Sequence, residues 1–143
     1  MFTLPCYVGI ILRKGPEVLL VKRHNTDWAS GQWNFPGGLL EEHETLLNAA
    51  IRETLEEVGV HVNPSSFELV HVLQVGINTQ NTKNILGFYF EAHSWQGTPV
   101  NNEPHRHSEA AWFNDNHLPS IATQHAVQVL EKLKTGIRYS EDR

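Results

Sequence analysis

The sequence predicts an α/β fold in which a mixed β-sheet carries helices on both sides. Two apolar runs, at residues 6–12 and 17–22, flank the turn-forming residues 13–16, which is typical of a hairpin of buried strands. Two later segments place apolar residues at helical spacing, and further strand-like runs lie between them. Because such an order in a chain of 143 residues builds layers around one core, we expect a single domain over residues 1–143.

The first half of the chain predicts a central hairpin and one helix. The strands at residues 6–12 and 17–22 are apolar almost throughout, which places the hairpin at the centre of the sheet. Helical spacing then runs over residues 45–58. We expect the helix to end at Gly59, because glycine readily takes the left-handed conformation of a C-terminal cap.

The second half predicts further strands and a last helix. The strands are expected at residues 67–75, 85–92 and 110–113, and a polar connection at 78–84 joins the first two. The last helix is expected to begin near residues 118–120 with Ser120 as its N-cap, and to pack on the sheet. The polar residues 136–143 predict a loose tail.

Charge and composition exclude several classes of protein. A formal net charge of -5 argues against binding to a nucleic-acid polymer, which needs a basic face. The chain has one cysteine, so no intrachain disulfide can form. No stretch approaches the ~20 apolar residues of a membrane span. The N-terminus lacks a charged region followed by a long apolar run, so we expect no signal peptide and a cytoplasmic location.

Three glutamates gather at the end of the first helix. On a helical wheel of ~100° per residue, Glu53, Glu56 and Glu57 fall on a different arc from the apolar core positions. The core positions are Leu47, Ala50, Ile51, Thr54 and Val58. Like charges within one turn repel, and the helix dipole disfavours acids in the last turn. Either the acids form a solvated face, or a hard cation such as Mg²⁺ or Mn²⁺ compensates them.

The segment around these acids resembles the Nudix box, the pattern G-x5-E-x7-R-E-U-x-E-E-x-G-U in which U is apolar. The matching positions are Gly38, Glu44, Arg52, Glu53, Glu56, Glu57, Gly59 and Val60. Only Thr54 departs, where a bulky aliphatic residue is usual. The resemblance implies the Nudix α/β/α sandwich and a Mg²⁺-dependent hydrolase, with Mn²⁺ as a substitute.

The resemblance also implies metal ligands. Glu56 and Glu57 match the glutamates that bind the metal in this family. Glu53 matches the residue that either binds a metal or orients and deprotonates the attacking water. Gly37 is expected to supply a backbone carbonyl ligand. These roles assign the metal site to Gly37, Glu53, Glu56 and Glu57.

Other box positions have structural and catalytic roles in the family. Arg52 and Glu44 are expected to pair and to hold the loop against the helix, and Arg52 counts with Glu53 among the catalytic residues. Gly38 is expected to allow the tight conformation of the loop and also to contribute to substrate binding. Gly59 ends the helix. For the Arg52–Glu44 pair, an ordinary exposed ion pair is the alternative.

Residues outside the box complete the predicted site. Glu103 is expected to be a late metal ligand or catalytic base, with Glu109 as second choice, although both could be surface charges. Arg23, at the end of a strand, is expected to bind substrate phosphates through its two-pronged guanidinium. Phe35 could stack on a base or pack the sheet. The His105-x-His107 spacing is a weak metal signal, since a solvated loop explains it as well.

Three functions remain open at this point. The first is a MutT-like enzyme that cleaves the phosphoanhydride of a nucleoside diphosphate derivative, converting a (deoxy)nucleoside triphosphate into a monophosphate and pyrophosphate. The second is an ADP-ribose or nucleotide-sugar pyrophosphatase. The third is a regulatory domain that binds a nucleotide without cleaving it, which the three retained glutamates disfavour. Homodimers are common among similar proteins, so we also allow a homodimer.

Overall fold

The computed structural model describes residues 1–76 and 84–142. Its two helices are α1 (Leu46–Val58) and α2 (Gln124–Lys134), and a short 3-10 turn spans Pro64–Ser66. The strands are β1 (Cys6–Lys14), β2 (Glu17–Arg23), β3 (Trp33–Asn34), β4 (Gly37–Leu39), β5 (Phe67–Val75), β6 (Ile85–Ala92), β7 (His107–Asn114) and β8 (Tyr139–Glu141). The predicted connection at 78–84 lies, up to residue 83, outside the described residues.

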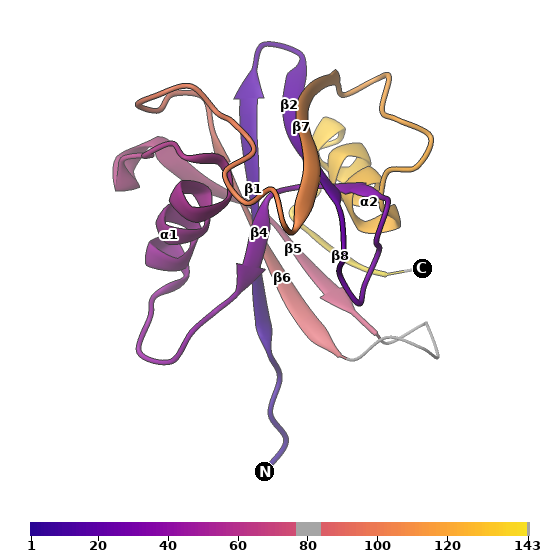
Figure 1. Ribbon diagram of the computed structural model, residues 1–143. Coiled ribbons are helices and arrows are strands. Elements are labelled where there is room, and N and C mark those ends of the chain that lie inside the picture. Colours follow the sequence, from indigo (N-terminus) through magenta and orange to yellow (C-terminus); the bar gives the residue numbers. More distant parts are fainter. Residues whose placement is uncertain (77–83, 143) are drawn as a thin grey trace.

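The strands form a mixed sheet with β1 at its centre. The order along the sheet is β3-β2-β1-β6-β5-β8, while β4 pairs with β1 and β7 pairs with β2. β1 runs parallel to β6 and antiparallel to β2 and β4. The helices lie on opposite sides of the sheet (Figure 1), so the predicted α/β class with helices on both sides is confirmed.

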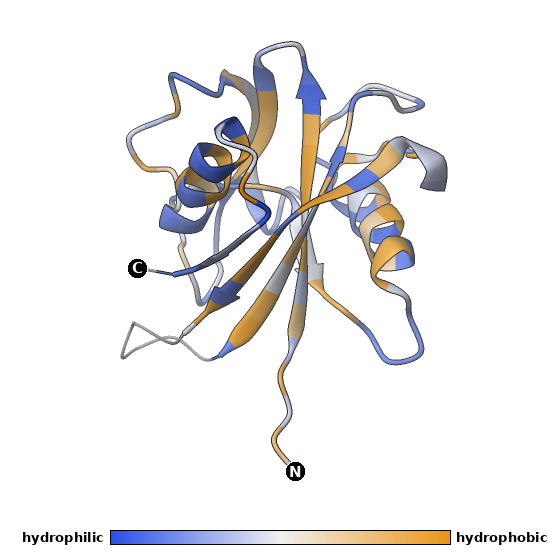
Figure 2. Cartoon of the chain, turned by 180° about the vertical axis from the view of Figure 1, so that it is seen from behind, coloured by the Kyte–Doolittle hydropathy of each residue, from blue (hydrophilic) through white to orange (hydrophobic). Residues whose placement is uncertain are grey.

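Each face of the sheet has its own hydrophobic core. On β1, Ile10 packs into the core beneath α1, whereas its neighbour Ile11 packs into the core beneath α2. On β2, Leu19 and Leu20 divide in the same way. Side chains of a strand alternate between faces, so strands covered on both sides must be apolar at consecutive positions. Figure 2 shows these apolar strands between the two helices.

The ends of α1 agree with the sequence, whereas the start of α2 does not. Thr45 caps α1 through its hydroxyl, and Gly59 ends the helix at a φ of 74°. α2 begins at Gln124 with Thr123 as its N-cap, so the predicted start near Ser120 was wrong. The reason is a tertiary contact: Trp33 donates its N–H to the carbonyl of Ile121 and accepts from the N–H of Thr123, which holds this segment extended along β3.

The predicted loose tail over residues 136–143 was wrong for the described part, because Tyr139–Glu141 form a strand of the sheet; residue 143 lies outside the described residues. β8 pairs in parallel with β5. Ser140 accepts hydrogen bonds from the side chain of Gln128 on α2 and shares one with His71 on β5. The carboxylate of Asp142 accepts the N–H of Gly76. A polar segment therefore becomes ordered by hydrogen bonding at the sheet edge rather than by apolar burial.

The seventh strand is longer than the sequence predicted. It covers His107–Asn114 rather than residues 110–113, because it pairs with β2 along nearly the whole of that strand. As for membrane insertion, neither helix of the described chain has the length and apolar character needed to cross a bilayer.

Candidate functional site

The three acids of the box occupy two different environments on α1. Glu53 and Glu57 are buried, with exposed fractions of 8% and 5%, whereas the Glu56 side chain is 51% exposed. The predicted separation of all three from the core face was therefore wrong for two of them. Glu53 and Glu57 flank the core arc of the helix, and they lie against the glycines of β4.

Gly38 makes room for the carboxylate of Glu53, and Gly37 makes room for the backbone of β1. A Cβ atom on Gly38 would collide with the carboxylate of Glu53, and one on Gly37 would collide with the backbone carbonyl of Val8. The N–H of Gly37 donates to Oε2 of Glu57 over 2.7 Å. The glycines therefore let the backbone of β4 lie against the acidic side of α1.

Arg52 ties the acidic side of α1 to the preceding loop. Its guanidinium binds both carboxylate oxygens of Glu44, at 2.6 and 3.0 Å, so the predicted pair is present. A further nitrogen donates to Glu53 at 2.9 Å and to Glu56 at 3.2 Å. One arginine thus fixes the loop and offsets part of the negative charge on the helix.

Glu53 carries a perturbed carboxyl group. The pKa of Glu53 is raised to about 7, first by burial and then by the negative charges of Glu57 and Glu56, while the hydrogen bond from Arg52 opposes the shift. The excess of negative charge is therefore only partly balanced by the protein itself. A carboxyl group that titrates near neutrality and lies beside a second buried acid is typical of functional sites.

The sequence did not single out His107 as a partner of the acidic helix. His107, the first residue of β7, is 3% exposed, and its Nε2 lies 3.2 Å from Oε1 of Glu57. The predicted solvated loop is wrong for this residue, although His105 is exposed. The His-x-His spacing gave no sign of the contact, because it depends on the pairing of β7 with β2.

The loop before β7 is anchored to the C-terminal end of α1. The side-chain amide of Asn102 donates to the carbonyls of Leu55 and Glu56, and its N–H donates to the carbonyl of Glu57. These bonds satisfy carbonyls that the end of a helix leaves unpaired. They place Glu103, the next residue, beside the acidic turn, whereas Glu109 is exposed and pairs in register with Lys22.

Arg23 and Phe35 differ in how well they suit their predicted roles. Arg23 lies opposite His107 in the β2–β7 register, and its Nε donates to the carbonyl of Trp28, whose ring it also covers at 5.1 Å. Phe35 is 1% exposed and packs edge-on against Tyr89 in the core beneath α2. The structure therefore selects the packing alternative for Phe35 over stacking on a base.

The residue Tyr7 connects Arg23 with the acidic pair. Burial raises the pKa of Tyr7 well above its ordinary value, and Tyr89 adds to the shift. Glu57 raises the same pKa and Arg23 lowers it, so both charges act on one hydroxyl group.

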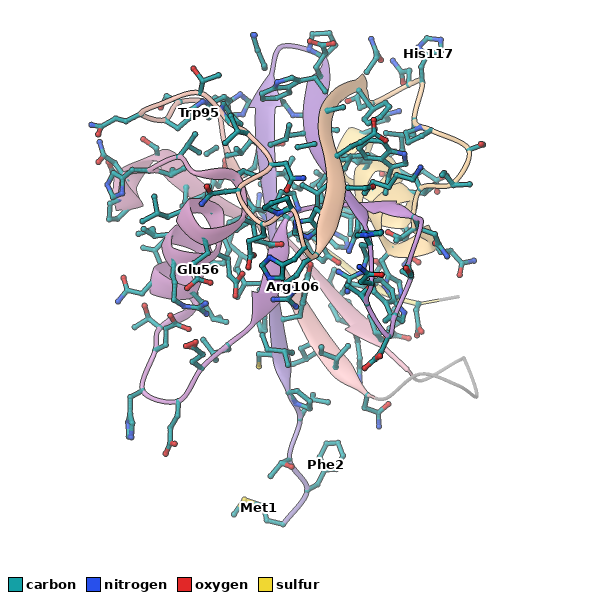
Figure 3. The ribbon with its side chains drawn as sticks, in the orientation of Figure 1. Met1, Phe2, Glu56, Trp95, Arg106 and His117 are labelled. Atoms are coloured by element: carbon teal, nitrogen blue, oxygen red, sulfur yellow. The ribbon has the colours of Figure 1, made fainter. Side chains whose placement is uncertain are left out.

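The donor atoms fit a hard divalent cation. The side chains are carboxylates, two of them are buried one helical turn apart, and the pKa of Glu53 is raised by its burial and then by the charge of Glu57. Within residues 1–76 and 84–142, however, no three His, Cys, Asp or Glu side chains converge as a ready-made metal cluster. Arg52, His107 and the N–H of Gly37 hold the carboxylate oxygens instead. Figure 3 shows Glu56 projecting from α1.

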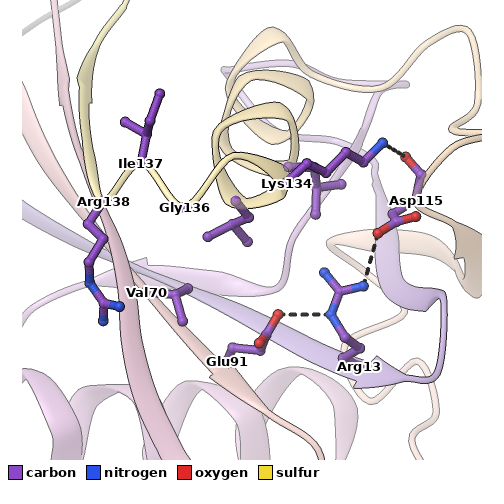
Figure 4. Close-up of a pocket in the computed structure, with 10 residues that line it drawn as sticks. Arg13, Val70, Glu91, Asp115, Lys134, Gly136, Ile137 and Arg138 are labelled. Atoms are coloured by element: carbon purple, nitrogen blue, oxygen red, sulfur yellow. Dashed lines mark hydrogen bonds and ion pairs between the residues drawn. The ribbon is translucent and has the colours of Figure 1, made fainter.

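A separate hollow of about 370 Å³ lies on the α2 side, lined by residues of β5, α2 and the chain between α2 and β8. Its cations already have partners: Arg13 bridges Glu91 at 2.9 Å and Asp115 at 3.1 Å, and Lys134 donates to the carbonyl of Asp115. Figure 4 shows these contacts. Because its cations are engaged and none of the box acids lines it, this hollow is not part of the acidic site.

Comparisons with known proteins agree with the geometry. The NUDIX domain family model matches residues 4–133. The human 8-oxo-dGDP phosphatase is 30% identical over 137 residues, which are 93% of this chain and 40% of that protein. The 8-oxo-dGTP diphosphatase of Escherichia coli K12 is 30% identical over 96 residues, which are 67% of this chain and 70% of that protein.

A solved structure shows the same architecture. The MutT NUDIX hydrolase from Burkholderia pseudomallei superposes with a TM-score of 0.82 at 28% identity, covering 91% of this chain and 98% of that one. The chain thus spans nearly all of that structure but only 40% of the human relative. With the family model matched over most of its length and the box acids gathered against the paired glycines, this chain belongs to the NUDIX family of hydrolases.

Proposed function

We propose that the protein is a Mg²⁺-dependent, MutT-like pyrophosphohydrolase that converts a nucleoside triphosphate into a monophosphate and pyrophosphate. The observation that carries this proposal is the buried pair Glu53 and Glu57, held against Gly37 and Gly38 on the box helix. The names of the human and Escherichia coli relatives, both of which act on oxidised deoxyguanosine nucleotides, support a nucleotide substrate.

The metal ligands of this proposal come from α1, β4 and the loop before β7. Nudix hydrolases generally use a divalent metal. We assign Mg²⁺, with Mn²⁺ as a substitute, to the carboxylates of Glu53, Glu56 and Glu57, together with the carbonyl of Gly37 and with Glu103. When bound, such an ion neutralises the phosphate chain, polarises a phosphoryl oxygen and lowers the pKa of a coordinated water.

The protein side chains supply proton transfer and orientation. Glu53 either binds the metal or orients and deprotonates the attacking water as a general base. Arg52 holds Glu53 at 2.9 Å and so fixes its direction. Arg23 binds phosphate oxygens. One water is consumed: its oxygen forms a new P–O bond, the anhydride P–O bond breaks, and no covalent enzyme intermediate forms.

A second candidate function uses the same site but acts on a nucleoside diphosphate instead of a triphosphate. The human relative is named as a phosphatase of a nucleoside diphosphate, 8-oxo-dGDP. The same acids acting on a diphosphate would release a monophosphate and inorganic phosphate. Products therefore separate the two candidates, and a sugar phosphate product would instead indicate an ADP-ribose or nucleotide-sugar substrate.

The test is a nucleotide panel with product analysis at saturating Mg²⁺. It includes the natural triphosphates, 8-oxo-dGTP, 8-oxo-dGDP and ADP-ribose. Pyrophosphate release from a triphosphate is the expected result. The proposal is overturned by turnover of a diphosphate or ADP-ribose alone, or by turnover that survives EDTA.

Paired variants identify the late acid. Glu103→Gln is expected to lose turnover, because the Asn102 contacts hold this residue beside the acidic turn. Glu109→Gln is the matched control, since it removes the same charge from an exposed position on β7. Loss of turnover in Glu109→Gln but not in Glu103→Gln would instead assign the role of late metal ligand or base to Glu109. The cytoplasmic location and the homodimer stay predictions.

A further inference from the structure

We propose that His107 is a positioning residue that holds the carboxylate of Glu57 in the orientation needed to bind the metal. The inference rests on the proposed function, because it assigns Glu57 as a metal ligand. It goes beyond that function by giving a role to a residue outside the box, on a strand 50 positions away in sequence. It follows from the contacts of Glu57, from the tautomer of His107 and from the path of β7.

Each oxygen of Glu57 lies next to a nitrogen of the protein: one accepts a hydrogen bond from Gly37, and the other is in contact with the imidazole of His107. Nε2 of His107 lies 3.2 Å from Oε1, and the N–H of Gly37 lies 2.7 Å from Oε2. A carboxylate that contacts the protein at both oxygens keeps a fixed orientation of its plane. Each oxygen still has a second lone pair, so a cation can bind without breaking either contact. Outer contacts of this kind orient metal ligands and raise metal affinity.

The unpaired nitrogen of His107 determines its tautomer. Nδ1 is buried and has no hydrogen-bond partner among the described residues. With the hydrogen on Nε2, the N–H lies beside Oε1 of Glu57, and Nδ1 has only an acceptor lone pair unsatisfied. With the hydrogen on Nδ1, a buried N–H would lack a partner, and the lone pair of Nε2 would face a carboxylate. The first tautomer is therefore favoured, because it has one fewer unsatisfied contact.

A β-bulge turns His107 toward α1. Lys22 pairs with Glu109, but the next residue, Arg23, pairs with His107, so Ser108 is an extra residue on β7. Simple alternation would put His107 on the same exposed face as Glu109. The extra residue reverses this, since bulges re-aim side chains. His107 is then buried while its two successors are exposed.

The backbone around His107 is fixed on both sides. Its N–H donates to the carbonyl of Glu103 over 2.9 Å, and its carbonyl accepts from the amide of Asn101 over 2.6 Å. These bonds belong to the loop that is anchored to the end of α1. The imidazole therefore has little freedom to leave Glu57, as a positioning role requires.

The test measures Mn²⁺ binding by calorimetry, separately from turnover. His107→Leu removes the donor at similar volume, and the Mn²⁺ dissociation constant is expected to rise by roughly 10- to 100-fold. His107→Gln keeps an N–H donor and is expected to restore affinity to within a few-fold of the wild type. His71→Leu is the matched control: it also loses a buried histidine, with contacts to Ile137 and Ser140, but lies away from Glu57. It should melt earlier and bind Mn²⁺ unchanged.

A second measurement needs no variant. Imidazole ¹⁵N shifts of the metal-free wild-type protein should show the His107 hydrogen on Nε2, and a hydrogen on Nδ1 alone would overturn the inference. Unchanged Mn²⁺ affinity in folded His107→Leu, while Glu57→Gln weakens binding, would overturn it and leave the proposed function standing. A wild-type protein that takes up no Mn²⁺ would overturn both.

Discussion

At the scale of single residues, Thr54 illustrates how the core tolerates a departure from the box pattern. It is fully buried where the pattern asks for a bulky aliphatic side chain. Its hydroxyl donates to the carbonyl of Ala50 over 2.6 Å, one turn earlier on the helix. Because a buried hydroxyl costs little once it has a partner, the threonine can occupy an apolar position without disturbing the neighbouring acids.

Glu53 predicts an unusual dependence of stability on pH. Its pKa is about 7 in the folded protein, mainly through burial, against an ordinary value of about 4.5 for a glutamate. Between these values the folded state binds the proton more tightly. The contribution of Glu53 to stability is therefore complete below pH 4.5 and is lost as pH rises through about 7. The loss is on the order of 3 kcal/mol.

The measurement compares wild type and Glu53→Gln in EDTA by urea unfolding at pH 5 and pH 8. Glutamine keeps the shape of the side chain and cannot ionise, so the variant should gain stability relative to wild type at the higher pH. Equal pH dependence of the two proteins would contradict the burial argument. Saturating Mg²⁺ should reduce the difference, because a bound cation favours the ionised carboxylate.

Alanine substitutions at the two glycines of β4 are expected to have different effects, one on stability and the other on turnover. In Gly37→Ala the new Cβ meets the backbone of β1, which cannot move alone, so the protein should lose roughly 1–3 kcal/mol of stability. In Gly38→Ala the Cβ meets only the end of the Glu53 side chain, which can swing aside. That variant should stay folded yet lose roughly 100-fold in turnover, since Glu53 is displaced. Thermal melts and kcat distinguish the two; a fully active Gly38→Ala would be inconsistent with the site.

At the scale of elements, α1 is closed at its two ends by different kinds of cap. Thr45 caps the start from within the local sequence. The other end receives Asn102, which arrives from a loop after β6. Both caps satisfy backbone groups that a helix leaves open. Only Asn102 also fixes the segment that carries Glu103. The cap at Thr45 therefore stabilises the helix alone, whereas the cap at Asn102 also positions a residue of the site.

Removing each cap tests this difference. Thr45→Ala and Asn102→Ala should each cost about 1 kcal/mol, since each removes side-chain hydrogen bonds to the helix backbone. Turnover should fall only in Asn102→Ala, because Glu103 loses its anchor. Chemical denaturation gives the first quantity and steady-state kinetics the second. Equal turnover in the two variants would indicate that the loop keeps its place without Asn102.

At the scale of the whole molecule, the sheet separates the catalytic side from a stabilising side. The box helix covers one face, while α2 covers the other. The C-terminal strand joins β5 at the edge furthest from β3. Stability supplied by β8 should therefore be independent of the chemistry on α1.

Truncation before Tyr139 is the corresponding prediction. It removes β8 and leaves His71 without its Ser140 contact and Gln128 without its bonds to Ser140 and Glu141. Buried polar groups without partners are costly, so the melting temperature should fall by at least roughly 5 °C. Tyr139→Ala, which keeps the backbone pairing of β8, should melt near the wild type. kcat measured below the transition should be unchanged, and a large loss of kcat would contradict the separation of the two sides.

The amino-acid sequence by itself determined the box helix, its closure at Gly59 and the pairing of Arg52 with Glu44, because these depend on spacing within one short segment. It also determined the central hairpin, since apolar runs mark strands covered on both faces. Tertiary structure decided which acids are buried, where α2 begins and whether the last residues form a strand. Each of these depends on a partner distant in sequence: β4 for Glu53 and Glu57, and β3 for the start of α2.

His107 is the clearest case of this division. A single extra residue on β7 turns its side chain from solvent to Glu57, and the alternation of a strand gives no hint of where such a bulge falls. The pairing with β2 fixes the bulge, and that pairing joins segments more than 80 residues apart. Local spacing can name the carboxylates of the site, but only the folded sheet can supply the donor that holds one of them in place.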